Sequence, residues 1–272
     1  TQLEMVKKLE LSHDDHYKII EHCQDKKIKF LSTGFDIPSI VFLRSLKLDL
    51  FKIPSGEITN LPLLRLIGSY NSRIILSTGM STLNDIEDAI KVLTLSGTEK
   101  KKITILHCTT QYPAPLKEVN LNVLSTIRKK FNLDVGYSDH SLGITVPISA
   151  VALGATVIEK HFTLDKNLPG PDHKASLEPD ELKLMVDSIR DVEEILGSSI
   201  KTVTASEKKN SLVARKSLVA KSFIKKAVKF IEKYITAKRP GTGISPIRYD
   251  EALKLKAPKD FLPDDLIQFT LD

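Results

Sequence analysis

The chain has 272 residues, of which 41% are hydrophobic and 27% are charged, and its formal net charge is +6. This composition is typical of a globular protein with one large domain, or a large and a small one. No apolar run reaches the roughly 18 residues of a membrane span. We therefore expect no membrane partner. Two cysteines, Cys23 and Cys108, are too few for a disulfide framework, which favours the reducing cytoplasm. Because no basic run alternates with aromatic residues, a nucleic-acid partner is not expected either.

Short β-prone segments alternate with amphipathic segments over the first part of the chain. The predicted strands are residues 27–33, 50–55, 73–78, 102–109, 134–139 and 155–160, and the predicted helices between them include residues 85–97 and 119–131. This alternation predicts a parallel sheet covered by helices. Six units are fewer than the eight of a (β/α)₈ barrel, so the pattern indicates either an open sheet or a barrel whose first two units precede Thr1.

Reactive side chains at the ends of the six predicted strands favour the barrel. They are Thr33, Lys52, Ser77, His107, His140 and His161. Sites in βα barrels form at the C-terminal ends of the strands. The six ends are therefore expected to converge on one mouth, with a run of ordinary polar strand ends as the alternative.

Two predicted helices and a change in composition after the second one define the predicted domain organisation. The run SHDDH has the residue types of a metal cluster, but it favours a helix start with Ser12 as N-cap. A long helix is expected from Pro179 to a stop at Gly197. The predicted division is a barrel domain over residues 1–197, a polar linker over 198–211, and a small β-rich domain over 212–272.

The segment VGYSDHSLG holds Ser138, Asp139 and His140, the residue types of a hydrolase triad, in consecutive positions. Neighbouring side chains of a strand point to opposite faces, so Ser138 and His140 share a face and Asp139 does not. The segment is therefore no triad by itself. Because His140 and His161 end neighbouring strands, they could share a metal ion and leave positions open for water and substrate; satisfied core histidines are the alternative.

An anion site is the second candidate. Lys52 faces the mouth if Phe51 packs outward, and a lysine with the hydroxyls of Ser55, Ser77 and Ser138 would hold phosphate or carboxylate. The alternative is that these serines are ordinary turn residues. A Cys–His nucleophile pair of His107 and Cys108 is not expected, because adjacent strand positions face opposite ways.

Seven motifs in order carry a family resemblance: FLSTGFD, FKIPSGEITNLPLL, ILSTGM, LHCTTQYPAP, GYSDHSLG, EKHFTLDKNLPGPDHKASLEP and KRPGTGIS. From about residue 28 onward the chain closely resembles the bacterial sialic acid synthases, which condense phosphoenolpyruvate (PEP) with an N-acylated amino sugar. The resemblance implies a (β/α)₈ TIM barrel joined to a C-terminal antifreeze-like (SAF) domain. It also implies a homodimer in which the SAF domain of one subunit covers the barrel mouth of its partner.

The resemblance assigns roles to named residues. It implies a divalent metal on His140 and His161, usually Mn²⁺ with Mg²⁺ or Co²⁺ as alternatives, and these histidines count with Glu57 as the catalytic residues. The residues implied for PEP are Thr33, Lys52, Ser55, Ser77 and Ser138. Those implied for the sugar are Glu57, Tyr112, Asp172 and Arg239, the last reaching across from the partner's SAF domain.

The activity implied first is N-acetylneuraminate synthase, which joins PEP, N-acetylmannosamine and water with C–O cleavage of PEP and release of phosphate. GPDHKASLEP and KRPGTGIS favour this acceptor. The first alternative is a legionaminic acid synthase that uses a 2,4-diacetamido-6-deoxy-mannose. A pseudaminic acid synthase is less favoured, and a truncated non-catalytic sugar-binding relative and a metal-dependent barrel hydrolase are the remaining alternatives.

The chain departs from the family pattern in two places. The family's Lys-Phe-Gln motif and the other residues of its first two strands are not in this sequence, and we expect them in a segment before Thr1. In the SAF segment, Ala227 and Val228 stand where the family usually has a glycine turn, and Lys254 stands where a glycine usually precedes the last strands.

Overall fold

The computed structural model describes residue 7 and residues 9–269. The chain divides into two compact units, Thr1–Gly197 and Ser198–Asp272, and each is described by itself. Within the described residues, no helix combines the length and apolar character that crossing a membrane requires.

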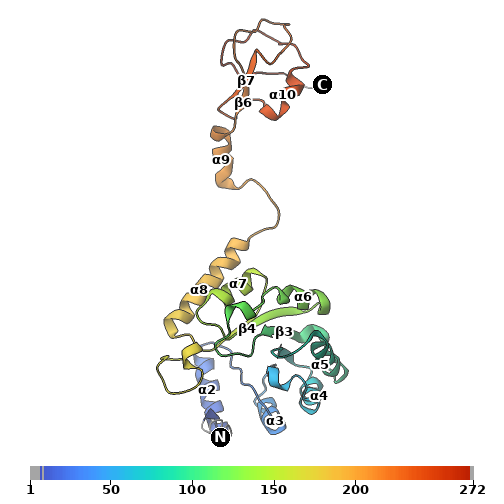
Figure 1. The fold of residues 1–272 in the computed structure, drawn as a ribbon, viewed down its shortest axis with the longest axis vertical. Coiled ribbons are helices and arrows are strands. Elements are labelled where there is room, and N and C mark those ends of the chain that lie inside the picture. Colours follow the sequence, from blue (N-terminus) through green and yellow to red (C-terminus); the bar gives the residue numbers. More distant parts are fainter. Residues whose placement is uncertain (1–6, 8, 270–272) are drawn as a thin grey trace. The chain divides into compact units, whose positions relative to one another are not determined.

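The first unit is an α/β fold built on a five-stranded parallel sheet (Figure 1). Its strands are β1 (Leu50–Ile53), β2 (Arg73–Ser77), β3 (Ile103–Cys108), β4 (Asp134–Asp139) and β5 (Ile158–Lys160). They lie in chain order, and every neighbouring pair is parallel. The predicted α/β class is therefore confirmed. Five of the six predicted strands are present: β4 has the predicted bounds, β1, β2 and β3 are slightly shorter, and β5 keeps only the second half of residues 155–160.

Helices precede, connect and follow the strands. They are α2 (His13–Asp25), α3 (Ile37–Ser45), α4 (Leu61–Ser69), α5 (Leu83–Leu95), α6 (Val123–Phe131), α7 (Thr145–Ala152) and α8 (Pro179–Leu196). As predicted, Ser12 is an N-cap: its hydroxyl accepts from the backbone N–H of Asp15, and the Asp15 carboxylate accepts from Ser12 in return. Pro179 opens α8 and Gly197 ends it, also as predicted.

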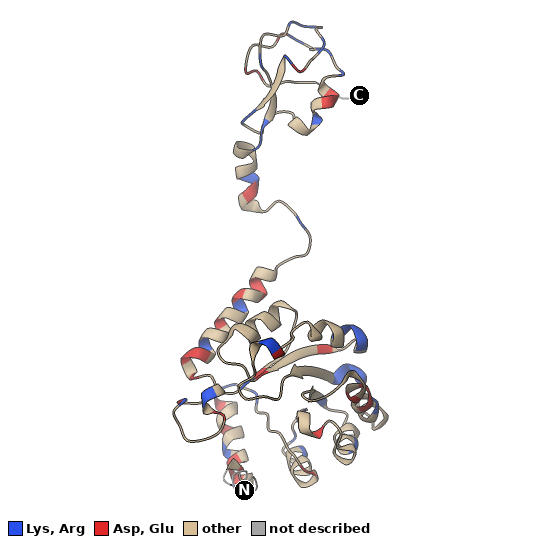
Figure 2. Cartoon of the chain, viewed as in Figure 1, with Lys and Arg blue, Asp and Glu red and all other residues tan. Residues whose placement is uncertain are grey.

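The face of the sheet that packs on the helices, called the outer face here, carries the hydrophobic core of this unit. Its strand residues include Phe51, Ile53, Ile74, Leu76, Ile103, Ile105, Val135 and Tyr137, all almost fully buried. The strands are largely tan in Figure 2, while charged residues gather on the helices and loops. Because Phe51 packs on this outer face, its neighbour Lys52 points to the opposite face, as predicted.

The first predicted strand, residues 27–33, is not a strand. The side chain of Ile28 is exposed, and the side chain of Lys29 forms an ion pair with Asp49 at 2.6 Å. The backbone of residues 27–33 forms no β ladder. In the part of the chain that the structure describes, β1 is paired only with β2. A β-prone run forms a strand only where a neighbouring strand supplies hydrogen bonds, so this prediction is wrong for the described structure.

The second unit contains α9 (Ala205–Ala214), the antiparallel strands β6 (Ser217–Ala220) and β7 (Ile235–Lys238), and α10 (Tyr249–Ala252). Isolated bridges add short β contacts, and Phe230 and Phe261 belong to a separate buried core. The predicted linker is partly helical, because Thr204 caps α9 together with Glu207. Ala227 adopts φ 67°, so the turn keeps the left-handed conformation that the family's glycine favours.

Candidate active site

The register of the sheet defines a second face, called the inner face here, opposite the helix-covered one. Lys52 pairs with Ile75 and Ser77 with Leu106, while Cys108 pairs with Ser138. Side chains at paired positions of parallel strands share a face. Toward the carboxyl ends of the strands, the polar or reactive residues that alternation places on the inner face include Lys52, Ser77, Cys108, Ser138, His140, Glu159 and His161.

The sheet curls so that its two edge strands meet across the inner face. Lys52 Nζ on β1 lies 3.2 Å from Glu159 Oε2 on β5. In a flat sheet the first and fifth strands would be roughly 19 Å apart, which is too far for these two side chains to touch. The sheet is therefore a half-barrel, and its inner face is concave.

Glu159 is a site residue that the sequence analysis missed. Its carboxylate accepts from Ser138 Oγ at 2.7 Å while it pairs with Lys52, whose side chain is only 6% exposed. The sequence carried a usable signal, because Glu159 stands two positions before His161 and so shares its strand face. Glu159 joins two of the groups predicted to hold PEP.

Ser55 and Ser77 supply further hydroxyls near these groups. Ser55 Oγ accepts from the backbone N–H of Gly79 at 2.9 Å and lies 3.2 Å from Cys108 Sγ. A Cβ on Gly79 would come within 2.2 Å of the Thr110 hydroxyl and 3.0 Å of Ser55 Oγ, so only glycine fits this approach. Ser77 Oγ is buried and has no hydrogen-bond partner among the described residues, so its hydroxyl can bond to a substrate oxygen or to water.

The two predicted metal ligands lie side by side, with ring centroids of His140 and His161 5.4 Å apart. His140 Nδ1 is 2.7 Å from the carbonyl oxygen of Thr109, and because a carbonyl only accepts, Nδ1 carries the proton and Nε2 keeps its lone pair. Burial lowers the pKa of His140, which favours the neutral, ligating form. Metal-binding histidines commonly donate their other N–H to such a carbonyl.

These residues fit a divalent ion held by two imidazoles. Within the described ranges, no group of three His, Cys, Asp or Glu side chains is placed to bind one metal. Water and substrate oxygens would complete the coordination of such an ion, as in catalytic sites. Because His161 Nδ1 lies 3.8 Å from Asp172 Oδ2, the predicted sugar residue Asp172 is next to this pair.

Tyr112 is the second sugar candidate that the structure places at the histidines. Its ring centroid is 4.2 Å from that of His140 and 5.5 Å from that of His161, and 44% of the residue is exposed. Burial raises the pKa of Tyr112, so its hydroxyl is a hydrogen-bond donor at neutral pH. The catalytic candidate Glu57 has a different partner: its carboxylate accepts a hydrogen bond at 2.5 Å from Nδ2 of Asn60, the N-cap residue of α4.

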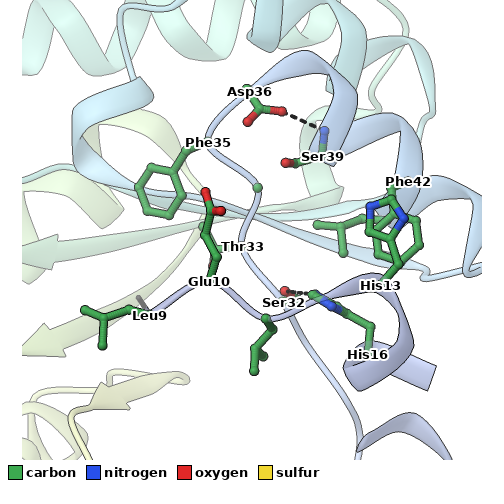
Figure 3. A pocket seen from close by; sticks show the side chains of 13 residues that line it. Leu9, Glu10, His13, His16, Ser32, Thr33, Phe35, Asp36, Ser39 and Phe42 are labelled. Carbon is green, nitrogen blue, oxygen red and sulfur yellow. Dashed lines mark hydrogen bonds between the residues drawn. The ribbon is translucent and has the colours of Figure 1, made fainter. Parts of the chain in front are cut away.

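Thr33 lines a different hollow, of about 500 Å³, which Figure 3 shows from close by. Its neighbours there include His13, His16, Phe35 and Phe42. His16 Nε2 lies 3.0 Å from Ser32 Oγ, so this histidine is occupied locally. The described hydrogen bonds and ion pairs do not join Thr33 to Lys52 or Ser138, and its predicted PEP role stays a prediction.

His107 does not belong to the mouth, and the prediction that all six strand ends converge is wrong at this position. Its ring packs against Tyr137 on the outer face at 5.5 Å, and Nε2 is 2.9 Å from the carbonyl oxygen of Val119. The neighbouring Cys108 faces inward, so the expected absence of a Cys–His pair agrees with the strand alternation. Burial lowers the pKa of His107.

Arg239 lies in the second unit, in the loop after β7. Its Nε donates to the carbonyl oxygen of Ala214 at 3.0 Å, and Gly241 N donates to the carbonyl of Leu212. These bonds fix the KRPG loop against the end of α9. The predicted role of Arg239 at a partner's barrel mouth stays a prediction.

Comparison with known proteins decides the family. The model of the NeuB family matches residues 1–201. The chain belongs to the NeuB family. This confirms the resemblance to sialic acid synthases and the prediction of an enzyme of the condensing synthase class.

Two curated relatives are named N,N'-diacetyllegionaminic acid synthase. The one from Campylobacter jejuni is 54% identical over 268 residues, which are 98% of this chain and 80% of the relative. The one from Legionella pneumophila is 46% identical over 248 residues, 90% of this chain and 70% of the relative. A solved N-acetylneuraminic acid synthetase from Leptospira borgpetersenii is 34% identical with a TM-score of 0.71, covering 76% of this chain and 72% of that one.

Proposed function

We propose that this member of the NeuB family is an N,N'-diacetyllegionaminic acid synthase that condenses PEP with a 2,4-diacetamido-6-deoxy-mannose. The observation that carries the proposal is the 54% identity with the Campylobacter jejuni enzyme over nearly the whole chain. The relatives therefore favour the alternative acceptor of the sequence analysis over N-acetylmannosamine, which was the first choice there.

The inner face offers what PEP requires. PEP is a trianion near neutral pH, and Lys52 supplies a buried cation against it. Ser138 and Ser55 lie close by, and the buried Ser77 hydroxyl has no described partner. Charge-assisted hydrogen bonds from such groups hold phosphate and carboxylate oxygens well. We assign Lys52 and these three serines to PEP.

His140 and His161 would hold the divalent metal, with Mn²⁺ as the first choice and Mg²⁺ or Co²⁺ as alternatives. When bound there, the ion would supply Lewis-acid polarisation of the sugar aldehyde. His140 presents Nε2 because its Nδ1 is used by the Thr109 carbonyl. Asp172 and Tyr112 lie beside the histidines and are assigned to the sugar, and Glu57 is assigned to the same substrate by family resemblance.

The proposed reaction balances without a redox partner. The PEP methylene carbon bonds to the aldehyde carbon of the open-chain sugar, and water supplies a hydroxyl to C2 of PEP and a proton to the aldehyde oxygen. The C2–O bond to phosphate then breaks while the new C2 hydroxyl gives its proton to the departing phosphate, leaving the keto acid and inorganic phosphate. Lys52 stabilises the departing phosphate, whose charge grows as that bond breaks.

The second candidate is the N-acetylneuraminate synthase first implied by the motifs. The solved Leptospira relative keeps this candidate under consideration, since it shares the fold at 34% identity. The two acceptors differ at the sugar positions that carry a second acetamido group and a 6-deoxy carbon. A direct comparison of the two sugars therefore separates the candidates.

The proposal includes the complete architecture expected of the family: a closed (β/α)₈ barrel, an SAF domain formed by the second unit, and a homodimer in which Arg239 acts on the partner's site. The second unit supports it by having a core and a β ladder of its own. A cytoplasmic location stays part of the proposal and would be tested by cell fractionation.

The reaction class is tested with PEP that carries ¹⁸O at the bridging oxygen. Protein from the complete reading frame is incubated with Mn²⁺ and the diacetamido sugar. C–O cleavage predicts label in the released phosphate, no release without sugar, and none after chelation. Label that stays in the organic product, or release that ignores the sugar, would contradict the proposal.

A further inference from the structure

A buried ion pair lies on the outer face, and each of its two residues comes one position before one of the two histidines in the chain. Lys160 Nζ is 2.6 Å from Asp139 Oδ2, and the side chains are 3% and 0% exposed. The two residues occupy paired positions of β4 and β5. Neither side chain belongs to the concave inner face, so the proposed function gives the pair no role.

The last two rungs of β4 and β5, and the two residues that directly follow these strands, are matched in type. Ser138 bonds to Glu159 on the inner face, Asp139 pairs with Lys160 on the outer face, and His140 stands next to His161 on the inner face again. Because successive residues of a strand alternate between faces, the ion pair is the rung immediately before the histidines. Any shift of this rung moves the backbone that carries both imidazoles.

Lys160 also holds both residues that flank His140. Its ammonium group donates to the Asp139 carboxylate and to the carbonyl oxygen of Ser141. Asp139 Oδ1 in turn accepts from the backbone N–H of Ser141 at 2.9 Å. Since Lys160 is the residue before His161, one ammonium group ties the chain on both sides of His140 to the start of the His161 segment.

We propose that Asp139 and Lys160 are positioning residues that hold His140 and His161 at the separation needed for one divalent ion. The inference rests on the proposed function, because it assumes that the histidines bind a metal. A buried ion pair is weak evidence for stability, since well-packed apolar residues of similar size often serve stability as well. What the pair adds is directional. Two charge-assisted bonds from Lys160 join the two strand ends, and the bond from Ser141 N–H to Asp139 fixes the turn that carries His140.

The test is Mn²⁺ affinity, measured from the electron paramagnetic resonance signal of free Mn²⁺ during titration of the whole chain. The variants are Asp139→Asn, Lys160→Gln and the double variant Asp139→Leu/Lys160→Met, which removes both buried charges together. Circular dichroism at the titration temperature identifies the variants that keep the native fold. The control double variant Lys130→Met/Glu87→Gln removes an ion pair between α6 and α5, 2.8 Å long and 34% and 60% exposed.

Folded variants of the buried pair are expected to bind Mn²⁺ about 10- to 100-fold more weakly, as for other groups that orient metal ligands. The control should stay within about twofold of the unsubstituted protein, because exposed pairs contribute little. A folded double variant of the buried pair with unchanged Mn²⁺ affinity would show that the pair is merely structural.

His140→Ala and His161→Ala separate this inference from the proposed function. If both variants lose Mn²⁺ binding while the buried-pair variants keep it, only the positioning inference is wrong. If Mn²⁺ binds equally well without either histidine, the metal site itself is wrong and the positioning inference is overturned with it.

Discussion

Lys52 and Glu159 come from opposite edges of a five-stranded sheet, yet their charged groups lie 3.2 Å apart. Lys52 is buried at 6% exposure, while Glu159 is 41% exposed and also holds Ser138. Glu159 therefore contacts two groups that the proposed function assigns to PEP. The arrangement implies that PEP and Glu159 compete for the same cation and hydroxyl.

Glu159→Gln is therefore expected to bind inorganic phosphate and PEP more tightly. Removing a carboxylate beside the anion relieves about 1–2 kcal/mol of repulsion at the effective dielectric of a partly exposed site, or about 5- to 30-fold in Kd. Isothermal titration calorimetry checks this. Glu99→Gln is the matched control, since Glu99 pairs with two lysines before β3, at the opposite end of the strands from the site. Unchanged or weaker phosphate binding in Glu159→Gln would refute competition at Lys52.

The pH dependence of stability should contain a contribution from His107. Burial lowers its pKa, so the folded protein favours the neutral ring. The contribution is complete above the unfolded pKa of about 6.5 and is lost as the pH falls through the folded value. Thermal melts of His107→Gln between pH 7.5 and 5 should decline less steeply than those of the unsubstituted protein. His22→Gln, at an exposed position of α2, is the control, and parallel profiles for His107→Gln and the unsubstituted protein would contradict the assignment.

Ala227→Gly should stabilise the second unit. Ala227 holds φ 67° while its N–H donates to Ala257 O at 2.8 Å, and a Cβ in this region costs about 1–2 kcal/mol. After the larger entropy of glycine in the unfolded chain, a gain of about 0.5–1 kcal/mol is expected, seen as a melting temperature raised by a few degrees. Ala237→Gly in β7 should instead lower it. A lower melting temperature for Ala227→Gly would show that the turn is not strained.

Action of Arg239 across a dimer is tested by mixing two inactive variants, Arg239→Ala and His140→Ala. If Arg239 serves the partner's site, a mixed dimer has one site with both residues intact, and activity returns on mixing and subunit exchange. If Arg239 serves its own subunit, no site is complete. Failure to recover activity in a verified mixed dimer would contradict the exchange of second units between subunits.

Strand alternation accounts for most of the residues whose position was predicted correctly. Once Phe51 was placed outward, Lys52 had to face inward, and the same rule separated Asp139 from Ser138 and His140. The caps of α2 and α8 were predictable because hydroxyl, proline and glycine positions act within a few residues. These features depend on local chemistry alone.

The failures depended on non-local partners. The side chain of His107 lies on the outer face, whereas its neighbour Cys108 faces inward. A shift of one residue along a strand moves a side chain to the opposite face, and the polarity of His107 does not reveal which face it occupies. Residues 27–33 have a strand composition but no ladder partner in the described structure. The contact of Lys52 with Glu159 was not predicted. The strand face of Glu159 could be read from the position of His161, but its partner could not, because the contact joins the two edge strands of a curled sheet.

The most direct test of the proposed function is acceptor choice. Phosphate release from PEP is measured with Mn²⁺ and protein from the complete reading frame, with the 2,4-diacetamido-6-deoxy-mannose and N-acetylmannosamine in parallel, each also with chelator. We predict chelator-sensitive release with a kcat/KM at least tenfold higher for the diacetamido sugar. Equal or higher kcat/KM with N-acetylmannosamine would contradict the proposed acceptor, and no release with either sugar would contradict the proposed reaction.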